Sequence, residues 1–159
     1  MTNALMFCMI IQKEGYSMKK VIFSIALLYS YLFAADINIE VQNLKNTIGK
    51  VSIGLYNKSE SFTIVSKVYK GVHLNIGSHT LSCTFKKIPE GIYAVSVFHD
   101  ENSNSKLDKN FLGIPKEGYG FSNNAKAMLS TPSFNEAKFE ISTQTVNLKI
   151  KMEYLNDKF

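Results

Sequence analysis

Arginine and tryptophan are missing from this sequence of 159 residues, and cysteine and proline are scarce, with two and three residues. Three prolines and nine glycines are too few for a collagen-like or low-complexity chain. No run of basic residues interleaved with aromatic residues occurs, so we do not expect nucleic-acid binding. Hydrophobic residues make up 45% of the sequence and aromatic residues 12%, which is enough for a buried core and excludes a disordered chain.

The N-terminal region is typical of a secretory signal peptide. Met18, Lys19 and Lys20 provide a basic start, an apolar run of fourteen residues covers 21–34, and small residues end it. The run is shorter than the ~20 residues that a transmembrane helix needs. A buried core helix is the alternative, but the run shows no amphipathic period.

We therefore expect an upstream extension at 1–17 outside the fold, a signal peptide at 18–34 that is cleaved after Ala34 or Ala35, and a single domain at 35–159 without a transmembrane segment. The mature domain would be periplasmic or secreted. It holds 15 lysines and 12 acidic residues, a net charge near +3. Its only cysteine, Cys83, cannot form an intrachain disulfide, and we expect a small buried side chain rather than a reactive thiol.

Hydrophobic and polar residues alternate in several short segments, as they do in strands that bury one face. The clearest segments are 37–41, 51–55, 93–97 and 146–152, and weaker ones are 64–69, 80–85 and 137–142. Separated by turn residues, they predict an all-β fold, an antiparallel Greek-key β-sandwich of about seven strands. Residues 124–130 could form a short helix, and 62–67 could be helical rather than extended.

Polar chemistry concentrates in one segment, where oxygen-bearing side chains recur at every second residue. Asp100, Asn102, Asn104 and Asp108 occupy relative positions one, three, five and nine, and the Lys106 carbonyl falls at position seven. Calcium takes six to eight oxygen ligands, and a looped chain can supply them at this spacing. The pattern predicts a Ca²⁺ site that stabilises the loop.

This segment departs from an EF-hand loop at two positions. Position six is Ser105 rather than glycine, and position twelve is Phe111 rather than glutamate. A bidentate carboxylate would have to come from Asp108, Glu101 or Glu117. The alternative is a plain turn in which Asp and Asn side chains cap the local backbone.

The following stretch, 111–125, is rich in glycine and aromatic residues and has no strand period. Long loops of this kind are usually functional or disordered, and the aromatic content argues against disorder. Tyr119 and Phe121 could form a ligand platform, with Asn123 and Asn124 as hydrogen-bonding groups for a glycan. The same side chains could instead pack the loop onto the sandwich.

Two resemblances support the fold. The 88–93 segment, IPEGIY, is loosely similar to the turn that enters a central strand in transthyretin-like and carboxypeptidase-regulatory-like sandwiches. Residues 91–125, GIYAVSVFHDENSNSKLDKNFLGIPKEGYGFSNNA, together with 132–137, PSFNEA, resemble the signature of domain of unknown function 2141, a family of small exported bacterial proteins. The resemblance covers 36 to about 154 and implies export and a small β-sandwich, without supplying an activity.

Catalytic groupings are not evident. His73, His79 and His99 form no metal-binding spacing, and no nucleophile partner for His99 can be identified. A small hydrolase of transthyretin-like fold ends in Tyr-Arg-Gly-Ser, which this arginine-free chain lacks. We therefore expect a non-enzymatic binding or accessory module of the bacterial cell envelope, with an envelope protein or a glycan as partner. The alternatives are a structural envelope-assembly domain and a small hydrolase that uses His99.

Overall fold

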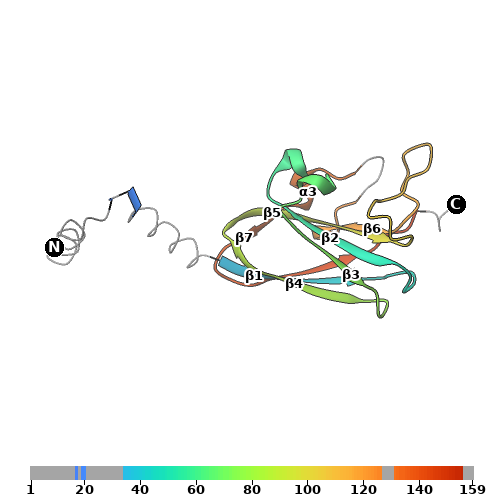
Figure 1. The fold of residues 1–159 in the computed structure, drawn as a ribbon, viewed down its shortest axis with the longest axis horizontal. Coiled ribbons are helices and arrows are strands. Elements are labelled where there is room, and N and C mark those ends of the chain that lie inside the picture. Colours follow the sequence, from blue (N-terminus) through green and yellow to red (C-terminus); the bar gives the residue numbers. More distant parts are fainter. Residues whose placement is uncertain (1–16, 18, 21–33, 127–130, 156–159) are drawn as a thin grey trace.

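The computed structural model describes residues 17, 19–20, 34–126 and 131–155, and the described part of the chain is mostly β-structure (Figure 1). Its eight strands are β1 (Ala34–Gln42), β2 (Lys50–Tyr56), β3 (Lys70–Asn75), β4 (Leu81–Pro89), β5 (Gly91–Asp100), β6 (Tyr119–Phe121), β7 (Phe139–Ile141) and β8 (Val146–Lys151). The helical elements are short: η1 (Ser59–Ser61), η2 (Val65–Lys67), η3 (Ser122–Asn124) and α3 (Phe134–Ala137).

The strands form two layers, which confirms the predicted all-β sandwich. One sheet has the order β4-β1-β8, and the other has the order β3-β2-β5-β6, with β7 pairing the beginning of β5. All pairs are antiparallel except β1 and β8, which run parallel from Ile37↔Val146 to Gln42↔Lys151. The exception arises because β7 belongs to the five-stranded sheet, so the chain crosses between the layers before it enters β8.

The main core lies between the two sheets. Alternate residues of β1, including Ile37 and Ile39, face alternate residues of β2 and β5 such as Ile53 and Val95, and all four are buried. Burying one side chain of this size contributes about 1.5–3 kcal/mol. The clear alternation in these strands therefore follows from a single buried face on each sheet.

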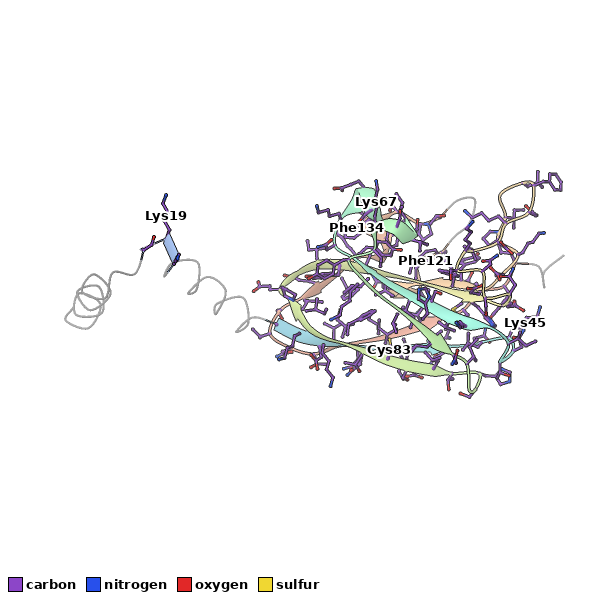
Figure 2. The ribbon with its side chains drawn as sticks, in the orientation of Figure 1. Lys19, Lys45, Lys67, Cys83, Phe121 and Phe134 are labelled. Carbon is purple, nitrogen blue, oxygen red and sulfur yellow. The ribbon has the colours of Figure 1, made fainter. Side chains whose placement is uncertain are left out.

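A second cluster covers the opposite face of the five-stranded sheet. It contains Tyr56, Phe62, Ala94, Tyr119, Phe121 and Ala137. Phe62 packs edge-to-face on Tyr56, with ring centroids 5.6 Å apart, and on Phe134 at 5.8 Å. Figure 2 shows Phe121 and Phe134 on this side, away from Cys83 on the three-stranded sheet. We call this face of β2, β5 and β6 the outer face.

The segment between β2 and β3 differs from the expectation of a strand at 64–69. Phe62 anchors the chain on the outer face, Thr63 has a positive φ of 64°, and η2 follows, close to the helical alternative at 62–67. Ile64 and Val65 are exposed. The strand begins only at Lys70, because the chain first turns across the aromatic cluster.

Two further elements were not expected. Strand β6 lies inside the stretch interpreted as a loop, and α3 follows the region where a helix was expected at 124–130. There, Asn124 ends η3, residues 125–126 are not helical, and 127–130 lie outside the described residues. Ser133 and Glu136 start α3 with a reciprocal capping box, which defines this four-residue helix locally.

The proposed extension at 1–17 and signal peptide at 18–34 fall almost entirely outside the described residues, although Ala34 is the first residue of β1. In the described part of the chain, no helix has the length and apolar character needed to span a membrane. Cys83 is half-buried against the main core, and burial raises the pKa of its thiol to about 11.

Candidate functional site

Strand β5 ends at Asp100, whose carboxylate organises the loop that follows. Asp100 is only 2% exposed, and its Oδ1 and Oδ2 accept hydrogen bonds from the backbone N–H groups of Asn104 (2.9 Å) and Ser105 (2.8 Å). Ser103 and Ser105 adopt positive φ values of 58° and 63°. Ser105 therefore takes the left-handed conformation that favours glycine, at the position where an EF-hand loop has glycine.

The remaining predicted side chains join the same network. Asn102 Nδ2 donates to Asp108 Oδ2 (2.7 Å), and Asn104 Nδ2 donates to Asp108 Oδ1 (3.1 Å). Asn104 Oδ1 accepts from the backbone N–H of Lys106 (2.8 Å). The structure thus brings the four side chains of the predicted cation set together, while Lys106 takes part through its backbone nitrogen.

Glu117 closes the loop at its base. This carboxylate is 6% exposed, and Oε1 accepts from Glu101 N while Oε2 accepts from Asp108 N, both at 2.9 Å. One side chain therefore holds the two ends of the 101–108 segment. The sequence had indicated Glu117 only as one of three candidate carboxylates, because the spacing along the chain does not show which residue returns to the base of the loop.

The donor set of this loop is mixed. In the described ranges, His, Cys, Asp and Glu side chains form no group of three that could hold a metal. A cation here would depend on amide and carbonyl oxygens beside Asp100 and Asp108. A carboxylate oxygen that accepts one hydrogen bond keeps a lone pair for a cation. The Asn102 and Asn104 amides, whose nitrogens face Asp108, would have to turn their oxygens inward.

Tyr119 and Phe121 lie on the outer face rather than in an exposed loop. Strand β6 pairs Tyr119 with Phe98 and Phe121 with Ser96 of β5, and both aromatic rings are buried in the second cluster. They line a pocket of about 640 Å³, which we call the outer-face pocket. Pockets of roughly 300–1,000 Å³ are typical of small-molecule sites.

The walls of the outer-face pocket come from several elements. Val65 and Val68 contribute from the segment around η2. Lys106 and Leu107 contribute from residues 100–108, which we call the Asp/Asn loop, and Lys109 contributes from the position just after it. The loop of the predicted cation site is therefore also one wall of the pocket. This connection could not be derived from the sequence, because it depends on the pairing of β5 with β6.

The Tyr119 hydroxyl has no hydrogen-bond partner among the described residues, although it is buried. The Tyr119 side chain is 3% exposed, and burial, followed by the nearby Glu153 carboxylate, raises its pKa. A buried hydroxyl without a partner costs about 1–3 kcal/mol by mutational measures. No hydrogen bond in the described part of the chain offsets that cost, so the Tyr119 hydroxyl is a buried polar group without a partner.

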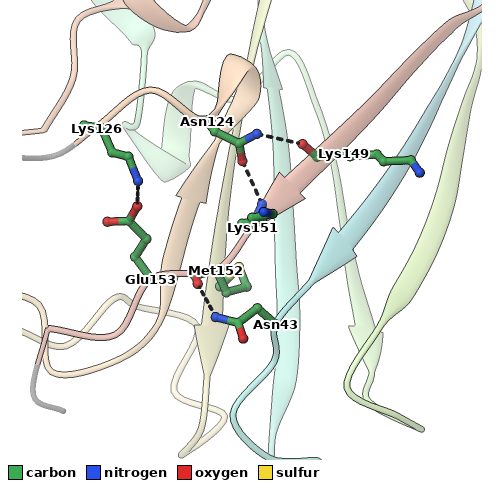
Figure 3. A network of polar contacts seen from close by, with 7 residues as sticks. All are labelled: Asn43, Asn124, Lys126, Lys149, Lys151, Met152 and Glu153. Carbon is green, nitrogen blue, oxygen red and sulfur yellow. Dashed lines mark hydrogen bonds and ion pairs between the residues drawn. The ribbon is translucent and has the colours of Figure 1, made fainter.

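The side chains of Asn123 and Asn124 connect η3 to the backbone of neighbouring segments. Asn123 Nδ2 donates to the Lys138 carbonyl (2.8 Å). Figure 3 shows Asn124 bonded to the edge of β8: Nδ2 donates to Lys149 O (3.2 Å), and Oδ1 accepts from Lys151 N (2.9 Å). The same view shows Lys126 paired with Glu153. Both asparagine side chains are exposed and are engaged by backbone groups in this arrangement.

The side chain of His99 lies inside the fold between two hydrogen-bond partners. His99 is fully buried: Nε2 lies 2.7 Å from the Ile48 carbonyl and Nδ1 lies 2.8 Å from the Tyr154 hydroxyl. A carbonyl only accepts, so Nε2 carries the proton and Nδ1 accepts from Tyr154. Both ring nitrogens of His99 are thus engaged by protein groups in this arrangement.

His73 was not singled out by the sequence. It lines the outer-face pocket, and its Nδ1 lies 2.7 Å from Ser52 Oγ, opposite it on β2. Alternation places Ser52 on the face opposite Val51 and Ile53, but its partner follows only from the pairing of β2 with β3. The ring is bonded to Ser52 rather than to an orienting carboxylate, so the pair serves here as a polar contact in the pocket wall.

Comparison with known proteins gives one family. The model of domain of unknown function 2141, described as an uncharacterized protein conserved in bacteria, matches residues 39–149. That range runs from β1 into β8 and includes the Asp/Asn loop and every lining residue of the outer-face pocket. No curated protein and no solved structure matches the chain.

Proposed function

The chain belongs to the bacterial family of domain of unknown function 2141, and from this premise we propose that it is an exported, non-enzymatic binding domain of the cell envelope. In this proposal Ca²⁺ orders the 100–108 loop, and the outer-face pocket beside it holds a small glycan. One observation carries the proposal: the Asp/Asn loop forms a wall of the 640 Å³ pocket. An ion that orders the loop therefore also shapes the ligand site.

Calcium is favoured by the chemistry of the loop. Two carboxylates, Asp100 and Asp108, and two amide side chains form one connected network of oxygens and nitrogens. Ca²⁺ accepts such a mixed oxygen set with flexible geometry, whereas Mg²⁺ demands near-ideal octahedral geometry. The ion would replace the amide-to-carboxylate bonds of Asp108 with direct coordination.

Thermal unfolding with Ca²⁺ and with a chelator tests the calcium part. Ligand linkage stabilises a folded protein by about 2.7 kcal/mol when free ligand exceeds its Kd a hundredfold. We expect Ca²⁺ to raise the melting temperature, a chelator to reverse the rise, and Mg²⁺ at equal concentration to have a smaller effect. An unchanged melting temperature in all three titrations would contradict Ca²⁺ binding and favour the alternative, a turn in which Asp and Asn side chains cap the local backbone.

The sharpest variant is Asp108→Asn. Asp100 is unsuitable because its oxygens accept two backbone N–H groups, so its replacement would damage the loop without any ion. The Asp108 carboxylate oxygens accept instead from the side chains of Asn102 and Asn104. We expect Asp108→Asn to abolish the Ca²⁺-dependent rise, and Glu140→Gln, an exposed change of the same charge, to preserve it.

A glycan is favoured because the pocket combines aromatic rings with hydroxyl-bearing side chains. Tyr56 and Phe121 contribute aromatic side chains to the pocket wall, and the ligand would supply the partner that the Tyr119 hydroxyl lacks among the described residues. Binding of a panel of disaccharides, followed by tyrosine fluorescence, should be tighter with Ca²⁺ than with chelator. Tyr119→Phe should weaken binding about tenfold, the value of one hydrogen bond of ~1.4 kcal/mol. Binding that is indifferent to Tyr119→Phe would exclude the pocket.

Export is supported by the residues before β1 and is tested at the mature N-terminus. Ala35 is buried in β1 and pairs with Ile88, so cleavage after Ala34 would retain that contact and cleavage after Ala35 would remove it. We expect periplasmic or secreted protein to begin at Ala35 when its N-terminus is determined by mass spectrometry. Recovery of the uncleaved chain in the cytoplasm alone would contradict export.

A further inference from the structure

A hairpin beyond the Asp/Asn loop carries two large apolar side chains away from the molecule. Phe111 is 95% exposed and Leu112 is 68% exposed, and Phe111 is the most exposed large hydrophobic residue in the described part of the chain. They are adjacent, at the turn of a hairpin whose arms meet at a bridge between Lys109 and Pro115. We call residues 110–114 the apolar tip.

The apolar tip is held by its own hydrogen bonds. Asn110 Oδ1 accepts from the backbone N–H groups of Leu112 and Ile114, both at 3.0 Å. The Asn110 backbone bonds to Ile114 O (2.8 Å) and to Gly113 N (2.9 Å). The turn is therefore built without any burial of Phe111 or Leu112, and its shape displays them.

Charges around the apolar tip are sorted by sign. Lys106, Lys109 and Lys116 are exposed on the chain just before and after it. Of the neighbouring acidic groups, Glu117 is buried on two backbone N–H groups, and the half-buried Asp108 accepts hydrogen bonds from two asparagine amides. The surface presented with the tip is apolar at its end and cationic behind it.

We propose that the apolar tip inserts into the surface of a bilayer containing anionic lipids. Side chains of Phe and Leu gain free energy when they leave water for the headgroup and acyl boundary, and lysines behind them are attracted to anionic headgroups. A small convex tip with cations at its base fits this environment, and charge complementarity selects the lipid. The insertion depends on the Asn110 turn and not on the outer-face pocket or on bound Ca²⁺.

The absence of tryptophan allows a direct experiment on the full chain. Phe111→Trp places the only tryptophan at the tip, and Ile92→Trp places it at a site 51% exposed near the start of β5, at the end of that strand opposite to the loop. Emission is recorded with phosphatidylglycerol-containing vesicles and with pure phosphatidylcholine vesicles. Lipids brominated on their acyl chains serve as quenchers.

We expect the Phe111→Trp emission to shift to shorter wavelength and to be quenched with phosphatidylglycerol vesicles, in Ca²⁺ and in chelator alike. The Ile92→Trp emission should stay unchanged. Because Ile92 lies at the end of the domain where β1 begins, a response there instead would report insertion of the N-terminal apolar run and would overturn the proposal. No response at either site, or a response only to a protein partner, would overturn it equally.

Lysine variants test the electrostatic part. In the Phe111→Trp chain, Lys109→Gln should lower the apparent partition coefficient about fivefold, because each lysine near an anionic surface contributes about that factor. Lys86→Gln, an equal charge change on β4, should leave it unchanged. Equal losses in both variants would mean that net charge, and not the tip, controls binding. If the parent chain bound vesicles but no disaccharide, the proposed glycan binding would be wrong and the insertion of the apolar tip would stand.

Discussion

The Tyr119 hydroxyl predicts an unusual change of sign among tyrosine-to-phenylalanine variants. Most substitutions at buried positions destabilise a protein, typically by about 0.5–3 kcal/mol. Tyr119→Phe removes a buried hydroxyl that has no partner among the described residues and leaves the ring in place. Because the desolvation of that hydroxyl is uncompensated, we expect the variant to be more stable than the parent chain by about 1 kcal/mol.

Two other tyrosines provide the contrast. Tyr154→Phe takes away the donor for His99 Nδ1 and the acceptor for the Lys45 backbone N–H. A buried acceptor left unsatisfied costs about 1–3 kcal/mol, so this variant should lose that amount. Tyr56→Phe removes a side-chain hydrogen bond with Ser96 and should lose about 1 kcal/mol.

Urea unfolding followed by circular dichroism measures all three variants. The slope of the free energy of unfolding against urea should stay constant, so that the midpoint alone reports stability. From the highest urea midpoint to the lowest, the expected order is Tyr119→Phe, parent chain, Tyr56→Phe, Tyr154→Phe. If Tyr119→Phe destabilised the chain as strongly as Tyr154→Phe, the hydroxyl would have a structural partner, and its assignment to a ligand would be wrong.

Three further predictions concern single carboxylates and the thiol. Glu117→Gln should lower the free energy of unfolding by about 2–3 kcal/mol, because the charged acceptor of two backbone N–H groups is lost. Hydrogen exchange at the Glu101 and Asp108 amides should become faster in this variant. The free energy of unfolding of the exposed control, Glu140→Gln, should stay within ~0.5 kcal/mol of the parent value. In the Cys8→Ser variant at pH 8, iodoacetamide should alkylate Cys83 roughly a hundredfold more slowly in the folded chain than in urea. The reason is that the Cys83 pKa of about 11 in the folded chain leaves little thiolate. Equal alkylation rates would contradict the burial of Cys83. The hydrogen bonds from Ser133 lower the pKa of Glu136. The melting temperature of the parent should therefore exceed that of Glu136→Ala at neutral pH, and this difference should disappear as acid protonates Glu136 in the folded chain. A difference that grows in acid would contradict the capping role of Glu136.

The strands that the sequence predicted well are those with one buried face. Ile37 and Ile39, or Val51 and Ile53, alternate with polar residues because one side of each strand meets the core. The period fails where a strand is too short to show it, as in β6, where Gly120 separates two aromatic residues. It also misleads at 64–69, where Phe62 draws the chain across the outer face and leaves Ile64 exposed.

The candidate site was predictable in its members and not in its bonding. Alternate spacing grouped Asp100, Asn102, Asn104 and Asp108, and the structure places them in one network. The role of Glu117 at the base of the loop depends on how the chain returns after Pro115, which spacing alone does not encode. The pocket required the pairing of β5 with β6, which joins residues far apart in the sequence.

The parallel pair of β1 and β8 has a consequence for how the chain is handled before it folds. β1 is the central strand of its sheet, and one of its two neighbours, as in the pair Asn38 and Asn147, lies 109 residues downstream. Contacts of such separation form late and slow a folding reaction. A chain emerging from the ribosome therefore cannot complete this sheet until β8 is released. Loss of that segment would leave an open edge on β1, ready to pair with a second molecule.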